Sequence, residues 1–142
     1  MERVTGIGGA FFRARDPDAL SRWYAQHLGI DAMNSETDEV WWQQEGPTVW
    51  APFPEHTDYF GQHDQQWMVN FRVRNLDAIL SQLREAGVPV DDNLQELEGI
   101  GRFGWAIDPE GNRFELWEPA PEALRRRRRD PQEDDASTGR GA

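Results

Sequence analysis

Hydrophobic and polar positions alternate with the twofold period of a β-strand near the C-terminal end of the sequence. Between Arg113 and Glu118, an arginine, a glutamate and a tryptophan share one face, and Phe114 and Leu116 share the other. Residues 103–107 form a second strand-like segment. The intervening Asp-Pro-Glu-Gly-Asn sequence (108–112) has the residues of a tight turn. The pattern predicts a β-hairpin.

Apolar residues recur with the period of an α-helix in two other segments. The first follows Asp16 and Pro17, which suit the start of a helix, and ends before Gly29. The second covers residues 76–86 and ends at Gly87. Both helices begin at a repeated sequence, because Phe-Arg-x-Arg-Asp-x-Asp-Ala at 12–19 recurs as Phe-Arg-x-Arg-Asn-x-Asp-Ala at 71–78. We therefore predict two similar units in tandem.

Strand patterns surround each predicted helix. Around the first helix we predict strands at 4–15, 30–33, 39–44 and 48–51, and after the second at 88–90 and 94–98 before the hairpin. Residues 53–65 have no clear period and are interpreted as a loop. The predicted fold class is α+β, with two βαβββ modules at about 4–53 and 66–119. Helices outside and strands inside would form a curved, partly open mixed sheet around a central cavity.

Composition and charge narrow the range of functions. The chain has 142 residues, enough for one domain with a substantial core, which we place at 1–120. The formal net charge of -11 argues against a nucleic-acid partner. No apolar run is long enough to cross a membrane, and no signal peptide is present, so we expect a cytoplasmic protein. The absence of cysteine and lysine excludes thiolate and Schiff-base chemistry.

The C-terminal segment 121–142 differs from the rest of the chain. It contains five consecutive arginines at 125–129, followed by acidic residues and then by Ser, Thr and Gly. A run of arginines can bind nucleic acid or an anionic membrane surface. The neighbouring acids nearly offset this charge, and the segment has no apolar face. We therefore expect a disordered, solvated tail.

Three short motifs resemble those of a known superfamily. They are Trp23-Tyr24-x-x-x-Leu28-Gly29, Asp108-Pro-x-Gly-Asn and Arg113-Phe-Glu-Leu-Trp. Together with the paired units, they resemble the vicinal oxygen chelate superfamily, which contains glyoxalases, bleomycin-resistance proteins and extradiol dioxygenases. The resemblance extends over about Val4 to Pro119. It implies the paired βαβββ fold and a homodimer, whereas activity must be argued from the site itself.

The resemblance also indicates where a metal would bind. Metal sites of the superfamily use up to four positions, which fall here at Gly9, Trp50, Met68 and Glu115. Only Glu115 has a side chain that can ligate a divalent cation. The three histidines lie on the first helix and in the 53–65 loop, at spacings that match no compact ligand motif. We therefore expect neither a metal site nor a cofactor.

The same strands predict the lining of the cavity. Beside Glu115, the side chains expected there are Phe11, Arg13, Trp50, Met68, Asn70, Arg72, Arg113 and Trp117. Aromatic walls with a few polar groups are typical of small-molecule sites, and arginines favour a carboxylate or phosphate on the ligand. Glu115 would orient a polar ligand group or act as a general base. In an alternative interpretation, tryptophans fill the cavity and Glu115 forms a structural ion pair with Arg13, Arg72 or Arg113.

Three functions are consistent with these features. The first is a metal-independent protein that binds a small aromatic or carboxylate-bearing molecule. The second is a metal-dependent lyase, isomerase or dioxygenase, as in other members of the superfamily. The third is a scaffold whose cavity is filled. Replacing Glu115 by glutamine separates them, because it should abolish turnover in an enzyme, weaken a binding protein, and be nearly neutral in a scaffold.

Overall fold

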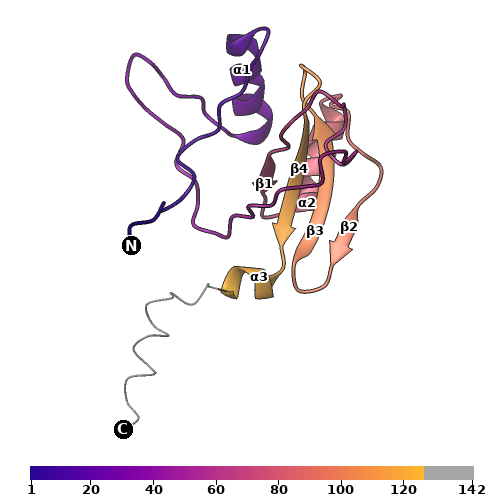
Figure 1. Ribbon diagram of the computed structural model, residues 1–142. Coiled ribbons are helices and arrows are strands. Elements are labelled where there is room, and N and C mark those ends of the chain that lie inside the picture. The colour runs from indigo at the N-terminus through magenta and orange to yellow at the C-terminus, as the bar shows by residue number, and fades with distance from the viewer. Residues whose placement is uncertain (127–142) are drawn as a thin grey trace.

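The structure of the protein is a computed structural model that describes residues 1–126. It contains helices α1 (Pro17–Leu28), α2 (Leu76–Glu85) and α3 (Pro121–Arg125), and strands β1 (Asn70–Arg72), β2 (Gln95–Leu97), β3 (Gly101–Ile107) and β4 (Arg113–Pro119). The strands form one mixed sheet in the order β1-β4-β3-β2, with α2 packed on one of its faces (Figure 1). The α+β class is confirmed. None of the helices in residues 1–126 has the length and apolarity needed to span a bilayer.

The predicted hairpin is the centre of the sheet. Strands β3 and β4 are antiparallel over seven residue pairs, with Trp105 opposite Glu115. Asp108 accepts hydrogen bonds from the backbone N–H groups of Glu110 (2.8 Å) and Asn112 (3.0 Å), which close the turn. Gly111 has a φ of 85°, a conformation that glycine adopts readily. The hairpin predicted from the turn residues and from strand alternation is therefore present in the structure.

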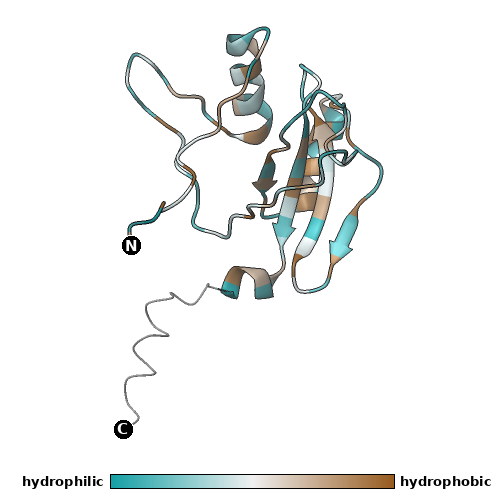
Figure 2. Cartoon of the chain, in the orientation of Figure 1, coloured by the Kyte–Doolittle hydropathy of each residue, from teal (hydrophilic) through white to brown (hydrophobic). Residues whose placement is uncertain are grey.

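Helix α2 supplies the hydrophobic core. Asn75 caps its N-terminus by accepting a hydrogen bond from the backbone N–H of Ala78 (3.0 Å). A buried stripe of three leucines packs with the apolar face of the hairpin; the buried cluster comprises Leu76, Leu80, Leu83, Val88, Ala106, Phe114 and Leu116. In Figure 2, brown segments on α2 and on the strands in front of it mark hydrophobic residues. The opposite face of β4 carries Glu115 and Trp117.

The second predicted module is present as β1-α2-β2-β3-β4. Strand β1 lies parallel to β4, with Asn70 opposite Glu115 and Arg72 opposite Trp117. A parallel pair needs a long crossover, which α2 and the following segment provide. The segment predicted as a strand at 88–90 contributes only an isolated bridge, between Val90 and Ala106.

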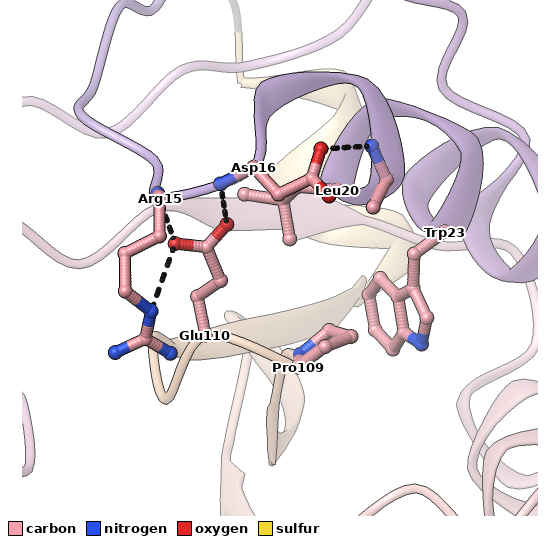
Figure 3. A pocket seen from close by; sticks show the side chains of 7 residues that line it. Arg15, Asp16, Leu20, Trp23, Pro109 and Glu110 are labelled. Carbon is pink, nitrogen blue, oxygen red and sulfur yellow. Dashed lines mark hydrogen bonds and ion pairs between the residues drawn. The ribbon is translucent and has the colours of Figure 1, made fainter.

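Helix α1 matches its prediction and attaches to the turn of the hairpin. Asp16 caps it by accepting from the N–H of Ala19 (3.1 Å), and Gly29 ends it at φ 68°. The carboxylate of Glu110 accepts hydrogen bonds from the backbone N–H groups of Arg15 and Asp16 (Figure 3). A hollow of about 300 Å³ lies beside this contact. Because Glu110 already accepts hydrogen bonds from the N–H groups that precede α1, we interpret the hollow as a gap at the contact between α1 and the hairpin, not as a ligand site.

The strands predicted around α1 do not form, and that part of the prediction was wrong for the single chain. Within residues 4–53 the structure has one isolated bridge, between Asn34 and Glu39, and no strand. Sequence alternation shows which face of a strand would be apolar but supplies no neighbouring strand, and an unpaired segment has no ladder hydrogen bonds. Many apolar side chains of this half are consequently exposed, including Phe11 at 98%.

The predicted C-terminal tail begins with a short helix. Residues 121–125, which composition predicts to be disordered, form α3, a single short helix with no buried residue. Within this helix, the backbone N–H of Leu124 donates a hydrogen bond to the carbonyl oxygen of Ala120. The rest of the predicted tail, 127–142, including most of the arginine run, lies outside the described residues.

Candidate functional site

The candidate site is centred on Glu115, in the middle of β4 on the face of the sheet away from α2. Its side chain is on the same side as those of Asn70 on β1 and Trp105 on β3, which are its register partners on the neighbouring strands. Only 7% of Glu115 is exposed. A buried carboxylate is costly unless its oxygens are hydrogen-bonded, so its partners decide what the site can do.

Three neutral groups donate hydrogen bonds to this carboxylate. Asn70 Nδ2 lies 2.6 Å from Oε1, and Trp105 Nε1 lies 2.8 Å from Oε2. The hydroxyl of Tyr59 also donates to Oε2. All three partners are hydrogen-bond donors, and none carries a charge. The site is therefore an acceptor surrounded by donors.

Sequence reasoning missed two of the three donors to Glu115: Trp105, on the predicted hairpin strand opposite it, and Tyr59. Tyr59 is the one that no strand pattern could have indicated. It lies in the loop 53–65, where no periodicity indicates which way a side chain points. Its ring is stacked on Phe53 (centroids 5.3 Å apart) and meets the Trp105 ring edge-on (6.0 Å). Burial, followed by the contact with Glu115, raises the pKa of the Tyr59 hydroxyl above its ordinary value. The hydroxyl thus remains a donor at neutral pH.

Arg113 holds the loop against the sheet. Its Nε donates to the carbonyl oxygen of Tyr59 (3.2 Å), and its guanidinium lies 5.3 Å from the centroid of the Trp105 ring. Gln65 bonds both the N–H (2.9 Å) and the carbonyl (2.7 Å) of Arg113. Nη1 of Arg113 also pairs with Asp91 at 3.4 Å. This arginine therefore positions the loop and makes no ion pair with Glu115.

Arg72 is also engaged away from the carboxylate. Its two terminal nitrogens donate to the carbonyl oxygens of Pro47 (2.6 Å) and Gln44 (2.8 Å). Within residues 1–126, no arginine lies within ion-pairing distance of Glu115. The ion pair with Arg13, Arg72 or Arg113, which belonged to the alternative interpretation, is therefore not formed. The observed partners of Glu115 are neutral.

Two stacked aromatic rings lie next along the face of the sheet that carries Glu115. Trp117, 4% exposed, is stacked on Phe103 with centroids 6.0 Å apart and an interplanar angle of 2°. Its indole N–H donates to the carbonyl oxygen of Ile100 (3.0 Å). Flat apolar walls next to a single acceptor resemble the lining of small-molecule sites.

The structure brings together the site residues predicted in the second half of the chain but not those of the first half. Asn70, Arg72, Arg113, Glu115 and Trp117 lie on one face of the sheet. Phe11, Arg13 and Trp50 are exposed, and the Trp50 ring lies against that of Trp67 (centroids 6.1 Å). Met68 is half-buried just before β1. Pairing between strands fixes the positions of the residues on the sheet, and residues 4–53 have no such pairing.

The chemistry of these side chains does not fit a metal ion. At the positions that the resemblance assigns to metal ligands, Gly9, Trp50 and Met68 offer no oxygen or imidazole ligand. The groups next to the fourth position, Glu115, present N–H and O–H donors, which would repel a cation. In residues 1–126, no group of three or more His, Asp or Glu side chains is arranged to hold an ion.

A second hollow, of about 810 Å³, lies between the outer face of α1 and residues 31–42. Asp31, Asp38, Glu39 and Trp42 are among its lining residues, with Arg22 from the helix. All five are exposed, and none makes a buried polar contact. This hollow lacks the convergent hydrogen bonds found at Glu115, which is therefore the stronger candidate.

Comparisons with known proteins agree with the motifs and the fold. The family model described as "Glyoxalase-like domain" matches residues 9–117. A comparison with curated proteins found no relative.

Two solved structures are similar over most of the chain. One is a member of the glyoxalase/bleomycin resistance protein/dioxygenase superfamily from Sphaerobacter thermophilus, with 19% identity and a TM-score of 0.52, covering 81% of this chain and 98% of its own. The other is a lactoylglutathione lyase from Agrobacterium tumefaciens, with 17% identity and a TM-score of 0.50, covering 82% and 96%. At these identities the likeness shows the fold alone. With the family match over 9–117, it follows that the chain belongs to the glyoxalase-like domain family, within the vicinal oxygen chelate superfamily.

Proposed function

We propose that this protein binds a small molecule, without a metal, on the sheet face around Glu115. The observation that carries the proposal is a buried carboxylate whose three partners are neutral hydrogen-bond donors, with no cation paired to it in residues 1–126. Such a carboxylate has no paired cation in the described part of the chain that would compete with a ligand. A carboxylate already neutralised by arginine would have one.

The surroundings of Glu115 support binding of a flat molecule. Trp105 is beside the carboxylate, and the stacked pair of Trp117 and Phe103 continues the same face. Aromatic rings supply apolar contact area at little conformational cost, while one buried acceptor supplies orientation. The face is covered by the loop that carries Tyr59, so a ligand has to move this loop or enter beside it.

A metal-dependent reaction is the alternative, and the side chains argue against it. Lewis-acid chemistry in this superfamily needs several ligands around one ion. Here only Glu115 has ligand chemistry at the four corresponding positions, and donors surround it. A general-base role would require one of the three donors to leave the carboxylate of Glu115, because both of its oxygens already accept hydrogen bonds.

The test combines metal analysis with a matched pair of variants. Elemental analysis follows purification of the untagged protein and reconstitution with Ni, Zn, Mn and Fe(II). Aromatic compounds are then screened by tryptophan fluorescence against the native protein, Glu115→Gln and Glu118→Gln. The control Glu118 lies on the same strand but bonds to Leu76 N–H and Arg102, away from the site. We expect no stoichiometric metal, and hits weakened about tenfold or more in Glu115→Gln alone.

Two results would contradict the proposal. Stoichiometric metal that depends on Glu115, accompanied by turnover, would favour the enzyme. Hits that bind both variants as tightly as the native protein would exclude Glu115 from the binding site.

We further propose that the protein is a homodimer. The supporting observation is the number of large apolar side chains exposed in the first half of the chain, among them Phe11, Trp42, Val49, Trp50 and Trp67. Large apolar side chains exposed in such number are typical of interaction sites. Sedimentation of the full chain should give about twice its 16.4 kDa. A monomer at every concentration would contradict this proposal without affecting the first.

A further inference from the structure

We infer that the ligand of this site presents a hydrogen-bond donor, preferably a protonated amine on an aromatic body, and that the Tyr59 hydroxyl occupies the donor's position in its absence. The inference rests on the proposed binding function and names the class of ligand. It begins from the polarity of the site: Glu115 contributes two acceptor oxygens, and each of its contacts comes from a donor. A second acceptor placed there would be repelled.

Of the three donors, Tyr59 is the one that a ligand can replace. Asn70 and Trp105 are on β1 and β3, where pairing with β4 fixes them beside Glu115. Tyr59 belongs to a loop, is half-buried, and reaches the carboxylate only through its terminal hydroxyl. Displacing it would leave the other two hydrogen bonds intact. The vacated place lies against the edge of the Trp105 ring.

The ring of Tyr59 shows what the rest of the ligand should be. It is held by stacking on Phe53 and by an edge contact with Trp105, so the site already accommodates an aromatic ring with a donor at its end. An aromatic amine has the same arrangement and adds a positive charge. A charge-assisted hydrogen bond to a buried carboxylate is roughly twice as strong as a neutral one, which would favour the amine over the phenol.

The arginines do not reverse this preference. Arg72 donates to two backbone carbonyls, and Arg113 is committed to the Tyr59 carbonyl and to Asp91. A ligand carboxylate would therefore lie close to Glu115, with both of these arginines engaged elsewhere. The carboxylate ligand expected from the arginines of the sequence is disfavoured by their actual contacts.

Three probes of similar size and different charge test the inference: benzylamine, benzyl alcohol and benzoate. The readout is the indole N–H signal of Trp105 in a proton–nitrogen correlation spectrum, assigned with Trp105→Phe. This indole donates directly to Glu115, so it reports binding at the carboxylate. Each probe is titrated into the full-length native protein and into Tyr59→Phe, Glu115→Gln and the control Glu118→Gln.

We expect benzylamine to shift the Trp105 signal and to bind at least about tenfold more tightly than benzoate. Its affinity should fall about tenfold in Glu115→Gln, remain unchanged in Glu118→Gln, and rise several-fold in Tyr59→Phe, where the competing hydroxyl is absent. The native protein and Tyr59→Phe keep the test decisive if Glu115→Gln fails to fold.

Different failures have different meanings. If benzoate shifts the Trp105 signal as strongly as benzylamine, the proposed binding site stands and the inferred ligand class is overturned. If benzylamine binds but Tyr59→Phe binds it more weakly, Tyr59 is part of the binding surface, and the inference that it holds the ligand's place is overturned. If none of the probes shifts the signal, the inference fails together with binding at Glu115.

Discussion

The hydroxyl of Tyr24 donates a 2.8 Å hydrogen bond to the carboxylate of Asp108, 84 residues further along the chain. Tyr24 lies on α1, and Asp108 begins the turn between β3 and β4. Asp108 is 4% exposed, and its other three hydrogen bonds come from within the turn. Two of the motifs that resemble the superfamily therefore meet in space. The Tyr24 side chain thus adds a second connection between the first helix and the hairpin, beside that made by Glu110.

Removing this bond should loosen α1. We expect Tyr24→Phe to lower the free energy of unfolding by about 1–2 kcal/mol, because the ring is kept and one carboxylate acceptor loses its partner. Urea denaturation followed by circular dichroism measures the change. The control is a double-mutant cycle with Asp108→Asn. Strictly additive losses in the cycle would show that the two side chains are not coupled.

Alkaline pH should destabilise the fold through its two hydrogen-bonded tyrosines. Burial, then contact with a carboxylate, raises the pKa of Tyr24 and of Tyr59 above the ordinary value of 10.0. A raised pKa means that the folded state holds the proton more tightly. This stabilisation is complete below pH 10, and declines as the pH rises above that value.

The variant Tyr24→Phe/Tyr59→Phe removes both groups and serves as the comparison. The free energy of unfolding is measured for both proteins from pH 8 to 11 by denaturant titration, a range chosen around the ordinary tyrosine pKa of about 10. We expect a steeper loss in the native protein. Parallel curves would contradict the prediction.

Gly101 should not tolerate a side chain. Its φ is 139°, and a Cβ at this position would collide with the carbonyl oxygen of Glu118 and approach the Trp117 indole nitrogen. We expect Gly101→Ala to cost about 2–3 kcal/mol or more, from backbone strain together with the collision.

Gly111→Ala is the matched control for this substitution. Gly111 also has a positive φ, of 85°, but a Cβ there would meet nothing closer than the side chain of Gln62 at 3.9 Å. Only conformational strain applies, so its cost should be about 1 kcal/mol. Thermal unfolding of both variants measures the difference. Equal losses would show that the collision at Gly101 is relieved by backbone movement.

Leu116 should be a sensitive position on the apolar face of β4. Its side chain is fully buried (0% exposed) in the cluster with Leu80 and Phe114. We expect Leu116→Ala to cost about 2–5 kcal/mol, because the cavity it leaves is enclosed by helix and sheet. Leu124→Ala, at a residue 55% exposed on α3, should change stability by less than about 0.5 kcal/mol. Similar losses would contradict the assigned core.

The features predicted correctly from sequence are those governed by local chemistry. The cap of α1 at Asp16, its end at Gly29 and the turn at 108–112 each depend on residues a few positions apart. Alternation along 113–118 placed Phe114 and Leu116 on one face and Glu115 on the other, and the structure puts the first two in the core with α2. The family followed from these same segments.

Tertiary structure decided the partners, because a partner is a distant residue and no local pattern names it. Tyr59 lies 56 residues before Glu115, in a loop without periodicity, and its hydroxyl donates to the Glu115 carboxylate. The strand pattern had instead indicated arginines as possible partners of Glu115. The first-half strands were predicted by alternation but lack a neighbouring strand in the single chain. The sequence by itself determined α1, α2, the hairpin and the face of β4 on which Glu115 lies. Which groups satisfy that carboxylate was decided only when β1, β3 and the 53–65 loop came together around it, since a hydrogen bond needs two groups within about 3 Å.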